Sequence, residues 1–206
     1  MTEPTLNELE RSNIRNAIAA AEAKTSGEIF VVVARVSDAY RSVPILWATG
    51  IALCAPLPLL LLTLMPALDI YLVQLAVFVV SAIVLTLPPI HIHTVPRQMQ
   101  QARAHERAVE QFLAHGLHMT EARTGALIFV SLAEHHAEIV ADAGIARKVS
   151  QSAWDTAIAK LIGEIHAGRL GEGLAVAVGD IGSILAAHFP PRLKNRDELV
   201  NDVVLL

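Results

Sequence analysis

Five charged side chains of kinds that bind ions or move protons lie at predicted strand ends or in the adjoining loops. They are Glu28, Asp38, Glu121, Arg123 and Asp142. Open α/β folds gather ligands at the carboxyl ends of parallel strands, so we expect these residues near one crevice, although Asp142 ends an antiparallel strand. With a second carboxylate nearby, Asp38 could coordinate a hard cation or position a water molecule. The competing interpretation, which we favour, is that they are solvated loop charges.

Two histidine pairs also have side chains that can bind a metal ion. His135 and His136 could do so as neutral imidazoles, but adjacent turn or strand residues point apart and no third ligand is apparent. We therefore favour a solvated turn. His91 and His93 stand at the end of a long apolar segment. There we favour anchoring at a membrane interface over a metal or proton site.

Glycines at 168, 171 and 173 resemble a dinucleotide-binding loop only superficially. They follow a predicted helix instead of a strand, so the geometry that cradles a pyrophosphate is missing and we expect a helix–helix turn. The sequence has no Gly-x-Ser-x-Gly, P-loop or His-Glu-x-x-His pattern. It therefore offers no assembled catalytic constellation.

The elements that would position these residues alternate between helices and buried strands. Apolar periodicity and turn residues predict helices and strands in the order helix 7–24, strand 28–34, helix 97–115, strand 126–132, strand 137–143, helix 150–168 and helix 171–188. The helix between the first two strands predicts that they are parallel. The short link before the third strand predicts an antiparallel hairpin. The predicted fold is α/β, a small α/β/α sandwich.

An apolar segment interrupts this domain after the first strand. Hydrophobic residues make up 53% of the 206-residue chain, and between Arg41 and Arg97 the only formal charge is Asp69. About 20 apolar residues suffice to span a bilayer as a helix, so we predict a two-helix transmembrane hairpin with spans 43–65 and 70–92. The competing interpretation is a buried helical pair, but nothing else in the chain is large enough to enclose it.

These segments divide the chain into three parts. Residues 1–42 and 94–191 form one discontinuous α/β domain, 43–93 form the hairpin, and the tail 192–206 is charged and then apolar. We expect the hairpin to turn at Pro66–Asp69, and Pro56 and Pro58 to kink its first span. The crossover helix is expected to grow directly out of the second span, and the tail to be a loose docking segment.

Charge distribution indicates orientation and excludes some partners. Basic residues flank both outer ends of the hairpin, and its turn has none, so the positive-inside rule places both termini in the cytoplasm. The flanking segments carry net charges of −1 and −2, which does not suit a nucleic-acid binder. The expected partners are the lipid bilayer and other membrane proteins. A single cysteine, Cys54, excludes an internal disulfide.

Three stretches carry a resemblance to a known family. They are AEAKTSGEIFVVVARVSD (21–38), RTGALIFVSLAEHHAEIVADAGI (123–145) and GRLGEGL (168–174). In this arrangement the chain resembles the TPM domain family, which includes thylakoid-lumen phosphatases and photosystem-repair proteins, as a membrane-anchored member of bacterial type. The resemblance implies an α/β/α sandwich tethered to a membrane, here the bacterial inner membrane. It also implies Ca²⁺ or Mg²⁺ as the class of cofactor.

The chain departs from the family pattern just before its second strand. The family commonly has Asp-Asn-Gly there, where this sequence reads Arg123-Thr124-Gly125. The change removes one candidate ligand for a hard cation, and an arginine could hold an anion instead. We therefore expect a scaffold, assembly or quality-control factor for membrane proteins. The alternative is a divalent-cation-dependent phosphatase acting on phosphate esters.

Overall fold

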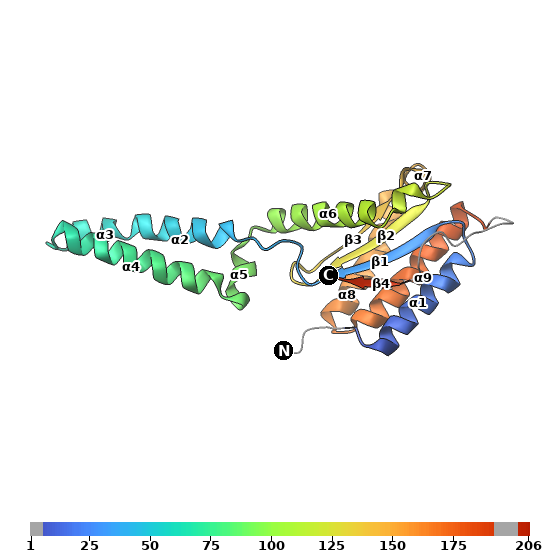
Figure 1. The fold of residues 1–206 in the computed structure, drawn as a ribbon, viewed down its shortest axis with the longest axis horizontal. Helices are drawn as coiled ribbons and strands as arrows, with labels where there is room; N and C mark the ends of the chain where they lie inside the picture. Colours follow the sequence, from blue (N-terminus) through green and yellow to red (C-terminus); the bar gives the residue numbers. More distant parts are fainter. Residues whose placement is uncertain (1–5, 192–201) are drawn as a thin grey trace. The chain divides into compact units, whose positions relative to one another are not determined.

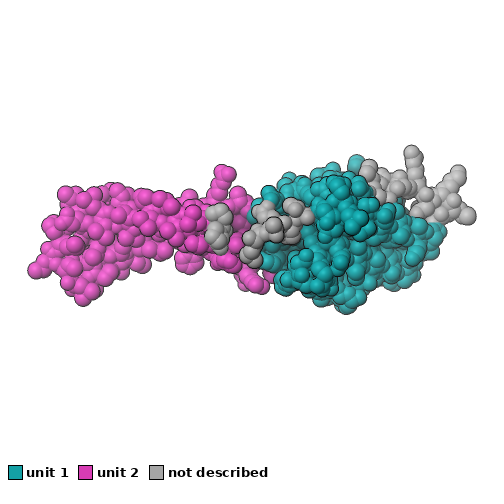
Figure 2. All heavy atoms as spheres, turned by 90° about the horizontal axis from the view of Figure 1, so that it is seen from below, with its two compact units in different colours: residues 1–37, 103–206 teal, residues 38–102 magenta. Residues whose placement is uncertain are grey.

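A computed structural model describes residues 6–191 and 202–206, apart from the side chains of residues 88 and 89. The chain divides into two compact units, residues 1–37 with 103–206, and residues 38–102 (Figure 2). The first unit is a mixed α/β domain assembled from two separate stretches of sequence. The second is built from helices alone, as far as the structure describes it.

A four-stranded sheet in the order β3-β2-β1-β4 forms the centre of the first unit (Figure 1). Its strands are β1 (Glu28–Ala34), β2 (Gly125–Ser131), β3 (His136–Ala141) and β4 (Val203–Leu205). The first two strands are parallel, and β3 pairs antiparallel with β2, as the sequence predicts. Every residue of β1 and β2 is buried, which explains why both are apolar except at Glu28, which opens β1, and Ser131, which ends β2.

The fourth strand was not predicted from the sequence. Val203–Leu205 pairs in parallel with β1, and the backbone NH of Arg35 donates to the carbonyl of Leu206 at 2.9 Å. The apolar end of the tail is therefore an edge strand and not a loose docking segment. Residues 192–201, which carry all the charges of the tail except Asp202, lie outside the described residues.

Helices cover both faces of the sheet (Figure 1). On one face α1 (Glu8–Glu22), α8 (Gln151–His166) and α9 (Leu170–His188) pack on alternate strand residues such as Val31 and Ile128. On the other face α6 (Arg97–Ala114) packs Ala104, Ala108 and Phe112 against Val32 and Phe129. Alternate side chains of each strand point to opposite faces, so one apolar run supplies both cores.

Two short elements lie near the start of β2. The 3₁₀ turn η1 (Leu117–Met119) precedes it, and α7 (Ala143–Ala146) follows β3. The carbonyl of Leu117 lies so close to Gly125 that a Cβ there would approach it to 2.4 Å. Glycine is therefore required at the first position of β2.

The second unit contains α2 (Ser42–Cys54), α3 (Pro56–Leu62), α4 (Ala67–Thr86) and α5 (Pro88–Thr94). Helices α2 and α4 pack against each other, and the buried Ala48 and Ala52 lie on α2. The first helical segment is interrupted at Ala55, whose dihedral angles remain helical. The interruption falls immediately before Pro56, which has no NH to donate, near the predicted kink.

Two details of the predicted hairpin were wrong. The loop between the helices comprises residues 63–66, while Asp69 lies in the first turn of α4, where an acidic residue favours the helix dipole. The crossover helix does not continue from the second apolar helix, because Leu87 and Val95 are extended, with ψ of 135° and 126°. Each precedes a proline, and the proline ring disfavours helical dihedrals at the preceding residue.

Within residues 6–191 and 202–206, three helical segments, 42–62, 67–86 and 170–188, are long and apolar enough to cross a membrane. The sequence predicted two membrane spans, and by length and composition α9 is a third candidate. Their environments differ, since half of the α9 segment is buried inside the protein, against 11% and 6% of the other two. The apolar residues of α9 already have a protein core to cover them.

Candidate functional site at the amino-terminal edge of the sheet

The structure separates the five charged residues predicted to lie together. Glu28 opens β1, and Glu121 and Arg123 precede β2, so these three stand at the amino ends of the parallel strands. Asp142 joins them, because β3 runs antiparallel and ends beside the start of β2. Only Asp38 follows the carboxyl end of β1. The expected crevice at the carboxyl ends was therefore wrong for four of the five, since they come before strands or follow a reversed one.

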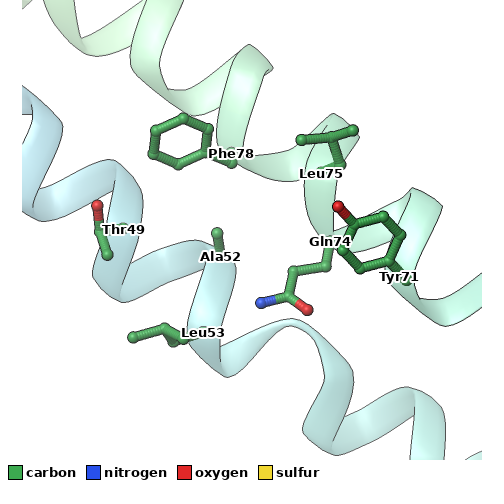
Figure 3. A pocket seen from close by; sticks show the side chains of 7 residues that line it. All are labelled: Thr49, Ala52, Leu53, Tyr71, Gln74, Leu75 and Phe78. Carbon is green, nitrogen blue, oxygen red and sulfur yellow. The ribbon is translucent and has the colours of Figure 1, made fainter.

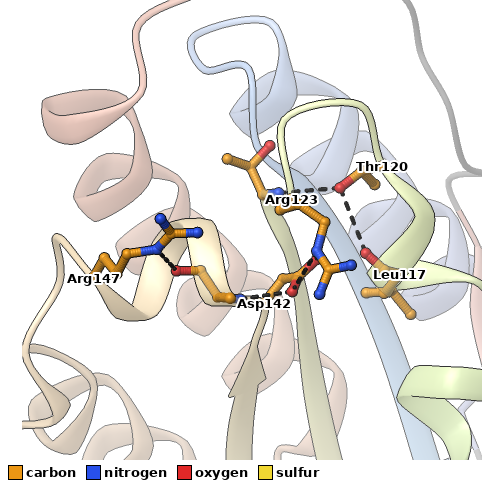
Figure 4. Close-up of polar contacts among 7 residues, drawn as sticks. Leu117, Thr120, Arg123, Asp142 and Arg147 are labelled. Carbon is orange, nitrogen blue, oxygen red and sulfur yellow. Dashed lines mark hydrogen bonds and ion pairs between the residues drawn. The ribbon is translucent and has the colours of Figure 1, made fainter.

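An ion pair between Arg123 and Asp142 is the centre of this edge (Figure 4). Nε of Arg123 donates to Oδ1 of Asp142 at 3.1 Å and lies 2.9 Å from Oδ2. The carboxylate is only 3% exposed, whereas the arginine side chain is 54% exposed. A buried carboxylate is thus neutralised by a cation that keeps contact with solvent.

Backbone contacts hold the two partners of this ion pair in place. Oδ1 of Asp142 also accepts from the NH of Ala143 at 2.6 Å, which caps α7. Arg123 has a left-handed φ of 55°, and its carbonyl accepts from the NH of Gly144 at 3.0 Å. A Cβ on Gly144 would lie 2.3 Å from that carbonyl oxygen. The loop and α7 therefore fit together only with glycine at this position.

Polar side chains close the loop on its other sides (Figure 4). Thr120 is buried, and its hydroxyl accepts from the NH of Thr124 at 3.0 Å. Arg147 donates from Nε to the carbonyl of Ala143 at 3.0 Å. Glu28 is buried at the head of β1, with its backbone NH donating to the carbonyl of Thr124. The edge is thus a hydrogen-bonded structure in which the guanidinium beside the buried carboxylate, that of Arg123, is half exposed.

The fit of a divalent cation to this edge can be judged from its donors. Asp142 offers one oxygen, Oδ2, without a hydrogen bond, but the Arg123 guanidinium already lies against it. A second positive charge beside that guanidinium would be repelled. Across the described residues, no group of three or more His, Cys, Asp or Glu side chains could hold a metal ion. The residues at this edge therefore do not fit a hard cation.

The histidines that the sequence singled out lie in separate places. The ring of His135, at the turn into β3, lies 5.7 Å from that of His166, whereas His136 lies in β3. In the helical unit, Nε2 of His91 lies 3.4 Å from the carbonyl oxygen of Tyr40. The sequence marked His105 only as part of a predicted helix, and in the structure this residue of α6 contacts Glu138 of β3.

A cluster of His105, His136 and Glu138 joins α6 to β3. Nδ1 of His105 lies 3.0 Å from Oε2 of Glu138, and Nε2 of His136 lies 3.7 Å from Oε1. Burial acts to raise the pKa of Glu138, but the interactions of its carboxylate with His136 and His105 outweigh it and hold that pKa below its usual value. Residues 105 and 138 are far apart in the chain, so no spacing in the sequence could have revealed this contact.

A second unpredicted cluster lies at the carboxyl ends of β1 and β2. The backbone NH of Ser37 donates to Oε1 of Glu134 at 2.9 Å, and its hydroxyl donates to Oγ of Ser131 at 2.8 Å. The hydroxyl of Ser131 in turn donates to Glu134. These bonds fasten the chain leaving β1 to the turn after β2. We interpret these hydrogen bonds as structural contacts that join the ends of β1 and β2 just before Asp38.

These features define a mixed α/β protein with a four-stranded sheet and with helices apolar enough to cross a membrane. The TPM domain family model matches residues 86–184, from the end of α4 into α9, so the family resemblance predicted from the sequence is confirmed.

The structure also resembles a solved one, that of the BA42 protein from the psychrophilic bacterium Bizionia argentinensis. The two share 21% sequence identity, with a TM-score of 0.63 over 100% of this chain and 98% of that one. At this identity the likeness speaks for the fold alone. Among curated proteins, none matches this sequence.

Proposed function

We propose that this chain is a membrane-anchored TPM-like protein that acts as a scaffold, assembly or quality-control factor for other membrane proteins. Helices α2 with α3, and α4, are its two membrane spans. The α/β domain and both termini lie in the cytoplasm, at the bacterial inner membrane.

The sheet supports a two-span arrangement. β1 precedes the apolar helices and β2 follows them, yet the two strands pair along their whole length. Both flanks of the insertion must therefore lie on the same side of a membrane, which requires an even number of crossings between them. Arg35, Arg41 and Arg97 flank the insertion, and the positive-inside rule favours the cytoplasm for that side.

The third apolar helix is assigned to the α/β domain. A Cβ on Gly182 of α9 would lie 2.5 Å from Cβ of Ala21, so α9 contacts α1 at very short range. Its Val178 and Ile181 are fully buried in the core beneath the sheet. Moving α9 into a bilayer would remove its apolar side chains from that core.

The observation that carries the scaffold function is the Arg123–Asp142 ion pair. The guanidinium of Arg123 lies against Asp142 at this edge of the sheet, at the position where the family pattern has an aspartate. A metal-dependent hydrolase needs an open position on its ion for water or substrate. A guanidinium held against the carboxylate offers no such position.

Titration of the full chain in mild detergent with Ca²⁺ and Mg²⁺ tests this proposal. We expect no binding heat from the wild type, and binding by Arg123→Asp/Thr124→Asn, which recreates the family's Asp-Asn-Gly before β2. Phosphate-ester hydrolysis by the wild type that is lost in Asp142→Ala would instead support the phosphatase. Hydrolysis unchanged in both Asp38→Ala and Asp142→Ala would exclude these residues from any such activity.

The scaffold itself is tested by crosslinking in intact cells followed by purification in mild detergent. We expect one membrane protein to be recovered reproducibly with the full chain. A chain in which a Gly/Ser linker replaces residues 39–96 is the matched control for membrane anchoring. Recovery of the uncombined chain alone, under several crosslinking conditions, would contradict a scaffold.

A further inference from the structure

A hollow of about 200 Å³ lies between α2 and α4 of the helical unit (Figure 3). Thr49, Ala52 and Leu53 border it from α2, and Tyr71, Gln74 and Phe78 from α4. The amide of Gln74 extends from α4 toward α2 in this view. It is the one carboxamide in the proposed spans.

The amide of Gln74 lies too deep to reach water, if α4 crosses the membrane as proposed. Gln74 stands seven residues after Ala67 and twelve before Thr86, roughly 10 Å and 18 Å along the helix at 1.5 Å per residue. The hydrocarbon core is about 30 Å thick. A side chain of this length placed near mid-helix cannot reach either headgroup layer. Tyr71, one turn nearer the start of α4, can.

Three other polar side chains of the spans are already hydrogen-bonded within their own helices. The hydroxyl of Thr49 donates to the carbonyl of Ile45 at 2.8 Å, and that of Ser81 to the carbonyl of Val77 at 2.6 Å. Thr86 likewise donates to Ala82 at 2.8 Å. For Gln74 the described residues provide no hydrogen bond. Its two donors and its acceptor therefore need a partner from outside the described part of the chain.

We propose that a second copy of this chain docks on the α2–α4 hollow, with the two Gln74 amides hydrogen-bonded to each other. In a two-fold dimer the same residue can meet itself across the axis. A carboxamide is self-complementary, because each can donate to and accept from the other. Polar side chains that hydrogen-bond across helices are a common basis of association within membranes.

This inference rests on the proposed membrane insertion and is tested with the full chain in its membrane. The natural cysteine is removed by Cys54→Ser, and Gln74→Cys or Leu72→Cys is then added. Leu72 is 52% exposed and points away from the hollow, since two residues along a helix turn through about 200°. Under mild oxidation we expect disulfide-linked dimers from Gln74→Cys and few from Leu72→Cys.

A second measurement uses no cysteine. In mild detergent, Gln74→Leu should weaken dimerisation by about tenfold, the range expected for interhelical hydrogen bonds in membranes. Ser81→Ala is the control, because its hydroxyl is already bonded within α4, and it should leave the dimer unchanged.

Each other outcome overturns the dimer. A wild type that is monomeric while resisting alkaline carbonate extraction would leave the membrane anchor intact and refute the pairing of Gln74. Equal crosslinking at positions 72 and 74, or a crosslink from position 74 to a different membrane protein, would also refute it. Release of the wild type by carbonate would contradict the membrane insertion itself, and the inference with it.

Discussion

Arg123 and Asp142 form an ion pair in which one partner is buried and the other is half exposed, with Nε 2.9 Å from Oδ2. Arg123 holds this contact from a left-handed backbone conformation, which is unusual for a residue with a Cβ. The loop therefore keeps an unfavourable dihedral angle while placing a positive charge on the carboxylate. We therefore infer that Arg123 stabilises the buried carboxylate at this edge of the sheet.

Arg123→Asn is the substitution that removes the charge with least disturbance, because asparagine tolerates the left-handed conformation. It leaves the carboxylate of Asp142 buried with no cation beside it. Losing one partner of a fully buried pair costs about 3–5 kcal/mol, but Arg123 is half exposed, so solvent screening reduces the expected loss to about 1–2 kcal/mol. Urea unfolding of the linker variant that lacks residues 39–96 measures it.

Arg147→Ala is the matched control for this loss. Its guanidinium donates to the carbonyl of Ala143 and forms no ion pair with Asp142, so we expect a change of about 0.5 kcal/mol or less. Equal losses in the two variants would show that the charge of Arg123 is not what stabilises Asp142.

Part of the fold could be predicted from the sequence because it depends on local patterns. The strands β1 and β2 are continuous apolar runs, and the helix between them was enough to predict parallel pairing. The strand Val203–Leu205 could not be recognised, because three apolar residues form a strand only when an open sheet edge accepts them.

The candidate site could be predicted only in its members and not in its arrangement. The residue types of Arg123 and Asp142 marked them, and the resemblance pointed to the same loop. Which edge they occupy depends on the direction of β3 relative to β2, and that pairing is a property of the folded sheet. The contact of His105 with Glu138 likewise joins two elements that only tertiary packing brings together.

Gly144→Ala should destabilise the α/β domain by about 2 kcal/mol or more, since overpacking against rigid backbone forces the chain to shift. The added methyl group would meet the carbonyl oxygens of Arg123 and Ala122 at 2.3 and 2.8 Å. Gly163→Ala is the control in α8, where nothing lies within 4 Å of an added Cβ. Alanine favours helix there, so stability should rise by up to about 1 kcal/mol. Thermal unfolding that responds alike to both changes would contradict this packing.

Glu138 should make the domain less stable in acid. Its pKa is lowered in the folded state, so its contribution is present above the pKa of the unfolded chain and is lost as pH falls through the folded value. Comparing urea midpoints of wild type and Glu138→Gln at pH 7 and at about pH 3 measures this. We expect a wild-type advantage of at most about 1 kcal/mol at pH 7, since the site is partly exposed, and almost none in acid. A wild-type advantage that is larger in acid than at pH 7 would contradict a lowered pKa of Glu138 in the folded state.

The assignment of α4 to the membrane and α9 to the soluble core can be tested with one pair of lysine substitutions. Val79 of α4 and Val176 of α9 are similarly exposed, at 46% and 51%. A lysine near the middle of a membrane span costs about 2.5–3.5 kcal/mol on insertion, whereas a lysine on a solvated helix face costs little. Val79→Lys should therefore reduce the carbonate-resistant fraction of the chain, and Val176→Lys should leave it unchanged. The reverse result would make α9 a span and would require its core residues to leave the sheet, because a helix cannot cover this sheet and cross a bilayer at once.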